Sequence, residues 1–269
     1  MHITVLLENT ALRDGLEAEH GLSFLIETGD RRVVFDTGAS EKTWSNAEKL
    51  DKDVSKADTV IISHGHYDHT GGLSALAKIA PAAEIYIRPA AFGDFYHGEK
   101  YIGAEKALSR LPRLHFTGEE ARIGDGLYLF SALSGSHPSP ASNRELTERT
   151  GSGEVPDAFL HEQCLTVREN GKSVLFSGCA HNGVLNILDR YRAIFGSDPD
   201  VMLSGFHTVR KNGYTDADVR EETALAETLS RMQTLFYTGH CTGDEPYERM
   251  KTILGDRLRR FRTGSEIIL

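Results

Sequence analysis

Six consecutive residues, His64-Gly65-His66-Tyr67-Asp68-His69, place three imidazoles and one carboxylate close enough together to share one or two metal ions. Two histidines separated by a single residue can both point inward from a tight loop, and the Asp-His pair that follows can turn toward a neighbouring position. Imidazole and carboxylate ligands together suit Zn, Mn or Fe(II). We therefore predict that His64, His66, Asp68 and His69 bind one or two divalent ions, with zinc as the leading choice.

A strand and a helix are expected to position this motif. Residues 58–63 form a short, apolar, β-branched run, which is typical of a buried strand. Thr70-Gly71-Gly72 then breaks the chain, and residues 73–79 have helical spacing. Loops between strands and helices are where α/β proteins place reactive side chains on a rigid scaffold. The motif is therefore predicted to lie on such a loop.

The motif resembles the His-x-His-x-Asp-His signature of the metallo-β-lactamase superfamily. Residues 19–23, 177–183, 205–207 and 239–243 are similar to the dihydropterin synthase-like branch, named for an archaeal ribofuranosyl-aminobenzene-phosphate dihydropterin synthase. The resemblance implies an αββα four-layer sandwich of two mixed β-sheets flanked by helices. It also places Asp36 where the family braces the metal loop by hydrogen bonding, although an ordinary Asp-Thr-Gly turn would use the same residues.

Three later runs that read as strands each lead to a histidine. Residues 173–177, 200–204 and 234–238 precede His181, His207 and His240 respectively. Residues 163–177 form a predicted hairpin, because Asn170-Gly171 is a turn signal. His181 and His240 are predicted metal ligands, with structural hydrogen bonding as the alternative. His207 is either a ligand or a contact to substrate.

Cys179 is a departure from the superfamily, because many relatives carry a bridging aspartate at this point. The thiolate could bind metal, or Cys179 could pack as a small buried residue while His181 supplies the ligand; we prefer the second alternative. His137 lies near the position where other branches place a ligand histidine and is a weaker candidate. The missing carboxylate puts a standard dinuclear hydrolytic centre in doubt.

The composition excludes several classes of protein. A chain of 269 residues with 39% hydrophobic content can bury the core of one α/β domain, and its net charge of −9 argues against a nucleic-acid surface. The N-terminus does not resemble a signal peptide, and no stretch approaches the length of a membrane span. Three cysteines without a C-x-x-C pair do not make a disulfide framework. We expect a cytoplasmic protein with neither nucleic acid nor membrane as a partner.

We expect a single domain that covers residues 1–269. Two of its segments are predicted lids or insertions. Residues 90–103 gather aromatic side chains, which would either stack on a flat ligand or pack as core. Residues 134–158 are rich in Ser, Gly and Pro, and are long enough to be a cover over the site or a surface loop.

These features predict a metal-dependent hydrolase or transferase that acts on a small phosphorylated or ester-like metabolite. The resemblance adds dihydropterin synthesis as a branch-level possibility, with a pterin-like substrate. It also assigns proton handling to Asp68, unless that residue only completes the coordination shell. Basic residues available for the mouth are Arg88, Arg144, Arg210 and Lys211. The alternative is a metal-bound ligand-binding or sensor protein without turnover. Homo-oligomerisation is compatible with either function.

Overall fold

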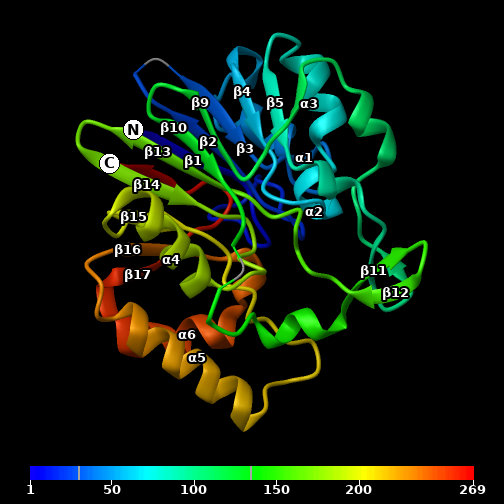
Figure 1. The fold of residues 1–269 in the computed structure, drawn as a ribbon. Coiled ribbons are helices and arrows are strands. Elements are labelled where there is room, and N and C mark those ends of the chain that lie inside the picture. The colour runs from blue at the N-terminus through cyan, green and yellow to red at the C-terminus, as the bar shows by residue number, and fades with distance from the viewer. Residues whose placement is uncertain (30, 134) are drawn as a thin grey trace.

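Two seven-stranded sheets form the body of the protein in a computed structural model that describes residues 1–29, 31–133 and 135–269 (Figure 1). In spatial order, the first sheet contains β18 (Glu266–Ile268), β1 (His2–Leu7), β2 (Ser23–Glu27), β3 (Arg32–Phe35), β4 (Thr59–Ile61), β5 (Glu84–Ile87) and β8 (Leu114–Phe116). The second contains β17 (Leu258–Arg260), β16 (Leu235–Thr238), β15 (Val201–Leu203), β14 (Lys172–Phe176), β13 (Cys164–Glu169), β10 (Leu127–Phe130) and β9 (Glu120–Gly124).

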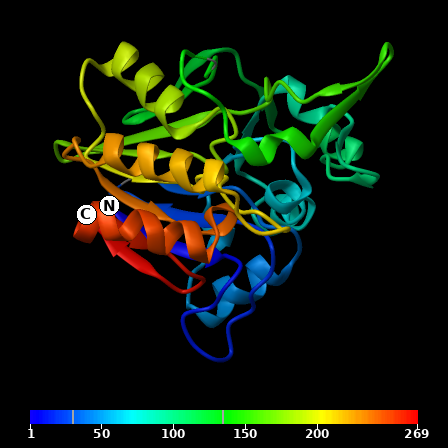
Figure 2. The ribbon, with the colours of Figure 1, turned by 90° about the horizontal axis from the view of Figure 1, so that it is seen from below.

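Helices cover the outer face of each sheet, so the molecule has four layers. The first sheet carries α1 (Lys42–Lys49) and α3 (Leu73–Ile79), while the single turn α2 (Tyr67–Thr70) lies on the loop after β4; the second sheet carries α4 (Val184–Phe195), α5 (Asp216–Leu229) and α6 (Asp244–Leu254). Figure 2 shows α5 and α6 side by side. Short 3-10 helices are η1 (Val54–Lys56), η2 (Pro89–Phe92), η3 (Lys106–Arg110), η4 (Ala141–Glu145), η5 (His240–Thr242) and η6 (Gly255–Arg257). The predicted αββα sandwich is confirmed.

The hydrophobic core has three parts that follow from this layering. Between the sheets, Phe24, Phe35 and Phe176 pack their rings at 5.8 to 6.4 Å between centroids. One cluster outside the first sheet joins it to α1 and α3, and another joins the second sheet to α4, α5 and α6. Both faces of the central strands are therefore buried, which explains their near-continuous apolar sequences.

The parallel strands bring the predicted ligand loops to one edge. β14, β15 and β16 are parallel neighbours, as are β3, β4 and β5 in the other sheet. The carboxyl ends of parallel neighbours meet at the same edge of a sheet. The loops that follow β4, β14, β15 and β16 carry the candidate histidines.

The hairpin prediction is confirmed, and short-range contacts also define the start of α5. β13 and β14 pair as a hairpin, and its turn residues Asn170 and Gly171 both have positive φ, as a two-residue hairpin turn requires. α5 begins at a capping box in which Thr215 accepts a hydrogen bond from the backbone N–H of Asp218, and the Asp218 carboxylate accepts one from the backbone N–H of Thr215.

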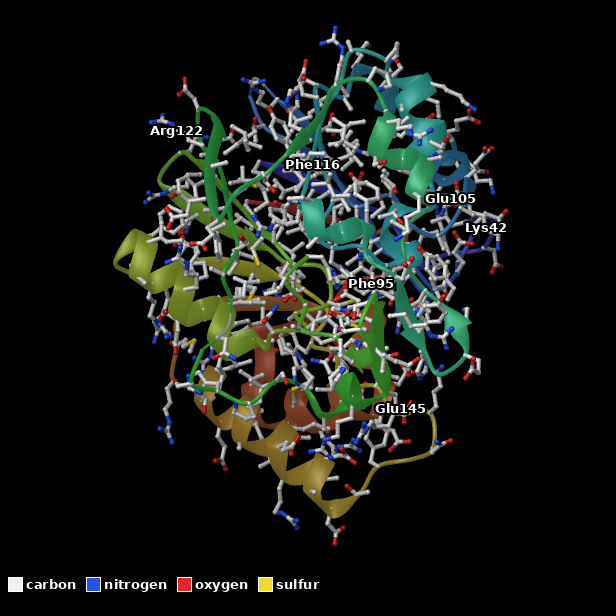
Figure 3. The ribbon with its side chains drawn as sticks, turned by 45° about the vertical axis from the view of Figure 1, so that its right-hand side comes forward. Lys42, Phe95, Glu105, Phe116, Arg122 and Glu145 are labelled. Atoms are coloured by element: carbon white, nitrogen blue, oxygen red, sulfur yellow. The ribbon has the colours of Figure 1, made fainter. Side chains whose placement is uncertain are left out.

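The two predicted lid segments meet in a small third sheet. It contains β12 (Gly153–Pro156), β11 (Leu146–Thr150), β6 (Phe95–His97) and β7 (Lys100–Tyr101), and Ser134 lies outside the described residues. Figures 1 and 2 show this sheet projecting from one end of the sandwich. Phe95, labelled in Figure 3, is buried against the ring of His161, so this aromatic residue packs as core. None of the helices in the described part of the chain is both long and apolar enough to cross a membrane.

Candidate metal centre and active site

The His64 loop is held in place by one buried carboxylate beneath it. Asp36 accepts hydrogen bonds from the backbone N–H and the hydroxyl of Ser63, and from Nδ1 of His69, each at 2.7 Å. Because the Ser63 hydroxyl donates to Asp36, it accepts from Nδ1–H of His64 at 2.8 Å. Both imidazoles therefore carry their proton on Nδ1 and present a lone pair on Nε2, the form that binds a metal.

In the later ligand loops, a hydrogen bond from Nδ1 again fixes the tautomer of the histidine. Nδ1 of His240 donates to Oδ1 of Asn9 at 2.8 Å, and Nδ1 of His181 donates to Oδ1 of Asn143 at 3.1 Å. Each asparagine thus fixes the tautomer of one imidazole and leaves its Nε2 free. Four histidines from three strand ends share this arrangement.

Three imidazoles, His66 among them, lie next to one another with an unpartnered Nε2. Nε2 of His64, His66 and His181 is buried and lacks a hydrogen-bond partner among the described residues. Their rings form a nearly equilateral triangle, with centroids 4.7 to 4.9 Å apart. Buried polar atoms without partners are rare in proteins, and a shared metal ion explains all three.

A second group of ligand atoms lies next to the first. Nε2 of His69 is 3.2 Å from Nε2 of His240 and 3.3 Å from Sγ of Cys179; Oδ2 of Asp68 is 3.3 Å from Nε2 of His240 and 3.7 Å from Nε2 of His69. Ligands of a tetrahedral zinc ion lie about 3.3 to 3.8 Å from one another, given metal bonds of about 2.0 to 2.3 Å. The residues present therefore fit a divalent metal ion.

Cys179 links the two groups. Its thiol belongs to a cluster with His64 and His181 and to a cluster with His69 and His240, and the ligand atoms of each cluster lie within 4.8 Å of one another. The structure thus brings together both residues that the sequence offered for the later ligand position. Cys179 lies between the two groups, where a bridging ligand would lie.

Burial keeps four of the candidate imidazoles in the neutral form that binds a metal. Burial lowers the pKa of His66 to about 3 and that of His240 to about 4, and holds the pKa of His64 and His181 well below its usual range. These side chains are therefore neutral at physiological pH. For His69, burial acts in the same direction, but the Asp36 and Asp68 carboxylates outweigh it and raise the pKa.

The Asp68 carboxyl and the Cys179 thiol differ in how burial and their neighbours shift the pKa. Burial opposes ionisation of Asp68, yet His69, His20 and His240 facing it hold its pKa well below the usual range. Burial and contact with the Cys241 thiol raise the pKa of Cys179 well above its usual range. Metal binding by Cys179 would therefore release a proton.

Glycines allow the ligand loops to approach each other. A Cβ on Gly178 would collide with the Ser63 side chain, and one on Gly65 would collide with the backbone of Ala91. Glu162 then braces the later loop, because its carboxylate accepts the backbone N–H groups of His181 and Asn182 at 2.7 and 2.9 Å. Glu162 plays the part beneath this loop that Asp36 plays beneath the first.

Sequence reasoning missed two histidines that face carboxylates. Nε2 of His20 is 3.1 Å from Oδ2 of Asp68, and Nε2 of His161 is 3.1 Å from Oδ2 of Asp157. Nδ1 of His161 accepts from the backbone N–H of Gly65, so its proton is on Nε2 and this nitrogen is a donor rather than a metal ligand. His20 lies in the segment 19–23 that is similar to the dihydropterin synthase-like branch, but neither residue has the spacing of a metal ligand, because each reaches the site through tertiary packing.

His137 and His207 lie outside the two ligand groups. His137 belongs to neither group and does not line the pocket over them; its Nε2 binds the Asp189 carboxylate at 2.9 Å. His207 binds the Ser142 hydroxyl through Nδ1 at 2.6 Å, and its ring lies 4.1 Å from that of His181. His207 therefore lies beside His181, and it also lines the pocket over the two groups.

A pocket of about 360 Å³ opens over the metal groups. Asp68, Cys179, His181 and His240 are among the residues that line it. Other residues of the lining are His20, His97, Lys100, Glu145, Arg210 and Lys211. Of the four basic residues expected at the mouth, Arg210 and Lys211 line this pocket, whereas Arg88 and Arg144 do not; Arg88 binds the carbonyl of Thr117 instead.

Comparison with known proteins identifies the family. A family model described as the metallo-beta-lactamase superfamily matches residues 16–230. The chain belongs to the metallo-β-lactamase superfamily. The crystal structure of Tm1679, described as a metal-dependent hydrolase of the beta-lactamase superfamily, matches 100% of this chain and 99% of its own, with a TM-score of 0.84 and 28% identity.

Two relatives from Methanocaldococcus jannaschii are similar over most of their length. One, an uncharacterized protein, is 26% identical over 90% of each chain. The other, a 7,8-dihydropterin-6-methyl-4-(beta-D-ribofuranosyl)-aminobenzene-5'-phosphate synthase, is 25% identical over 84% of this chain and 82% of its own. Relatives of this superfamily member thus include a hydrolase by description and a synthase by name.

Proposed function

We propose that this protein is a zinc-dependent enzyme that hydrolyses, or transfers a group on, a small phosphorylated or ester-like metabolite. The observation that carries the proposal is the convergence of two ligand groups on Cys179 beneath an open pocket. Imidazole and thiolate donors favour zinc over the harder ions Mg and Mn. His64, His66 and His181 would hold one ion, and Asp68, His69 and His240 the other.

The chain's own residues prepare the reaction. When bound, the ions supply Lewis-acid activation of water and of a substrate oxygen. Asp68 is ionised and faces the pocket, so its carboxylate can accept a proton from an attacking group. Nε2 of His20 holds the same carboxylate oxygen at 3.1 Å and thereby restricts its orientation.

The charges at the mouth support an anionic substrate. Lys100 and Lys211 line the pocket, and neither has a carboxylate within ion-pair distance among the described residues. Nζ of Lys100 is 3.1 Å from the Tyr67 hydroxyl, and Nζ of Lys211 is 3.1 Å from Nδ1 of His97. Glu145 of the same lining pairs with His97 at 2.8 Å and with neither lysine directly. Two cations without a direct ion pair, at the mouth of a pocket in a chain with net charge −9, favour a phosphate or carboxylate on the substrate.

A synthase-type transfer is the second candidate. It is favoured by the similarity to the dihydropterin synthase relative, which extends over 84% of this chain. In that case, the anionic group of the substrate would bind at Lys100 and Lys211, while the transferred group lies at the metal centre. A protein that binds metal and ligand without turnover is the remaining alternative.

Elemental analysis and turnover together test the proposal. Protein purified without added metal is expected to contain zinc and to hydrolyse bis(4-nitrophenyl) phosphate or a simple lactone. The His66→Ala variant should lose activity and metal, whereas His115→Ala, an exposed histidine paired with Glu84, should retain both. Metal-replete parent protein that turns over neither probe would contradict hydrolysis. Full activity of His66→Ala would contradict metal catalysis.

A further inference from the structure

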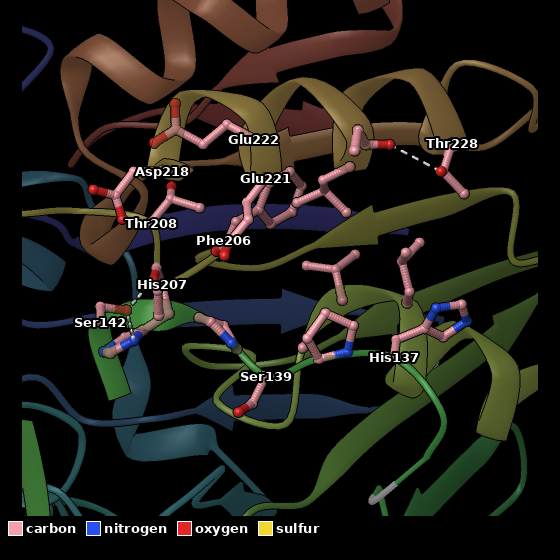
Figure 4. Close-up of a pocket in the computed structure, with 18 of the residues that line it drawn as sticks. His137, Ser139, Ser142, Phe206, His207, Thr208, Asp218, Glu221, Glu222 and Thr228 are labelled. Atoms are coloured by element: carbon pink, nitrogen blue, oxygen red, sulfur yellow. Dashed lines mark hydrogen bonds between the residues drawn. The ribbon is translucent and has the colours of Figure 1, made fainter. Parts of the chain in front are cut away.

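A second cavity lies beside the metal pocket, beneath α5. Its volume is about 250 Å³, and its walls are residues 137–142, the start of α4 and one side of α5 (Figure 4). Ser142, His207 and Arg210 line both this cavity and the metal pocket. The two spaces are therefore neighbours that share one wall.

His207 is the central residue of this shared wall. Its Nδ1 is held by the Ser142 hydroxyl at 2.6 Å, as the dashed line in Figure 4 marks, and its backbone adopts a positive φ of 50°. Such a conformation is uncommon outside glycine and persists where the surrounding structure imposes it. Since the His207 ring lies 4.1 Å from that of His181, one imidazole separates the cavity from a metal ligand.

The lining of the cavity is mainly apolar. Its apolar residues include Pro138, Pro140, Val184, Phe206 and Leu225. Its charged residues are mostly paired already: Arg210 binds Asp218 at 2.9 Å, and Glu222 binds Arg249 at 2.7 Å. Glu221 is the remaining acid of the lining and is exposed to solvent. Because its inner charges are compensated, the cavity suits an uncharged group.

The size of the cavity limits what it can bind. A dry apolar cavity of about 150 Å³ is sufficient to bind benzene. A volume of about 250 Å³ therefore accommodates a substituted ring or a small bicyclic system. Polar groups of such a ring would meet the end of the cavity where Figure 4 labels Ser142, His207 and Thr208.

We propose that this cavity is a second binding site, which holds an uncharged ring of the substrate while the reactive group occupies the adjoining metal pocket. The inference rests on the proposed function and specifies its substrate class: an anionic compound that also carries an apolar ring. A hydrolase for small compact metabolites would have no use for this second space. An enzyme that joins or cleaves ring-bearing compounds would use both spaces.

Indole binding to the metal-loaded protein, measured by titration calorimetry, tests the site without requiring turnover. Leu225→Trp should fill the cavity and weaken indole binding by about tenfold or more, because the ring loses its buried apolar contacts. Ala224→Phe, which fills the same space from an exposed position, is a second variant in case Leu225→Trp does not fold. Leu12→Trp, at an exposed leucine outside both pockets, is the matched control.

Two phosphodiester substrates test whether the cavity contributes to turnover. Filling the cavity should lower kcat/KM for bis(4-nitrophenyl) phosphate, whose second ring needs the cavity, and leave methyl 4-nitrophenyl phosphate unchanged. Equal indole affinity in the parent and both filled variants would overturn the proposal. Equal losses for both diesters would also overturn it, because they would indicate damage to the metal centre. If the parent hydrolyses neither diester, phosphodiester hydrolysis is excluded as its activity, and the indole titration alone decides whether the cavity is a binding site.

Discussion

At the scale of single residues, hydrogen-bond partners decide which histidines present a nitrogen that can bind metal. His64, His69, His181 and His240 each donate from Nδ1 to an oxygen, which leaves Nε2 available. His161 has the opposite arrangement, because its Nδ1 accepts a backbone N–H. The same side chain is thus a ligand or a hydrogen-bond donor according to one neighbour.

Asp36→Asn is expected to weaken metal binding by roughly 10- to 100-fold, the usual cost of losing a partner of a metal ligand. Asp36 accepts three hydrogen bonds on two oxygens, whereas an amide has one oxygen and turns an NH₂ group toward a donor. Its backbone φ of 59° is tolerated by asparagine, so the backbone need not change. Competition with a chromophoric chelator measures the affinity, with Asp125→Asn at an exposed acid as control.

Cys179→Asp is expected to change which metal the protein prefers. A carboxylate is a harder donor than a thiolate, so the ratio of Mn to Zn affinity should rise relative to the parent. Cys164→Ala, which alters a buried cysteine in the core next to α4, should leave that ratio unchanged. Competitive loading with both ions, read by elemental analysis, would contradict a ligand role for Cys179 if the ratio stayed the same.

At the scale of elements, the ends of strands and helices position the site. The loops after β4, β14 and β16 deliver ligands to one edge, while residues from the small third sheet and its connections supply Asn143 and His161. α5 forms one side of the second cavity and begins at the Thr215 capping box. The position of α5 therefore affects the cavity rather than the metal ligands.

Thr215→Ala should lower the free energy of unfolding by about 1 kcal/mol at neutral pH, because the helix loses its N-cap. The Thr215 hydroxyl is also the main reason that the pKa of Asp218 lies below its usual value. A lowered pKa stabilises the fold above the ordinary aspartate value of about 3.9, and this stabilisation is lost as the pH falls through the lowered pKa.

The difference in stability between parent and Thr215→Ala should therefore narrow below about pH 4. Urea unfolding of both proteins at several pH values measures this difference in the free energy of unfolding. Thr228→Ala, in the interior of the same helix, is the control, since its hydroxyl bonds only to the carbonyl of Ala224. A constant difference at all pH values would show that the cap and Asp218 are not linked.

At the scale of the whole molecule, basic side chains gather at the pocket although the chain as a whole is acidic. The chain carries −9, yet Lys100, Arg210 and Lys211 gather at the pocket, from the small sheet on one side and the loop after β15 on the other. Arg210 is neutralised by Asp218, so the two lysines carry the positive potential there. A local cationic region in an acidic protein attracts anionic ligands selectively.

Lys100→Gln and Lys211→Gln should each raise KM for a phosphorylated substrate, or the inhibition constant of inorganic phosphate, by roughly two- to fivefold, as expected for an exposed ion pair. kcat should change little, because neither lysine touches the metal ligands. The effect should shrink as salt is added. Lys78→Gln, on the exposed side of α3, is the control, and equal effects in all three variants would contradict a specific anion site.

Much of the site was predictable from local sequence, because strand and helix periodicity and the His-x-His-x-Asp-His spacing act over a few residues. The hairpin at Asn170-Gly171, the cap at Thr215 and the loop that carries His64 to His69 all follow from such short-range preferences. The αββα layering followed from the family resemblance.

Distances between remote segments were decided only by the tertiary structure. Packing of separate strands and lids places Cys179 between the two ligand groups and keeps His137 out of them. It also brings in the hydrogen-bond partners Asn9, Asn143 and Glu162. The cavity beneath α5 is likewise a property of packing between segments about 80 residues apart. The sequence alone determines which residues can bind a metal, and the packing of both sheets determines which of them meet.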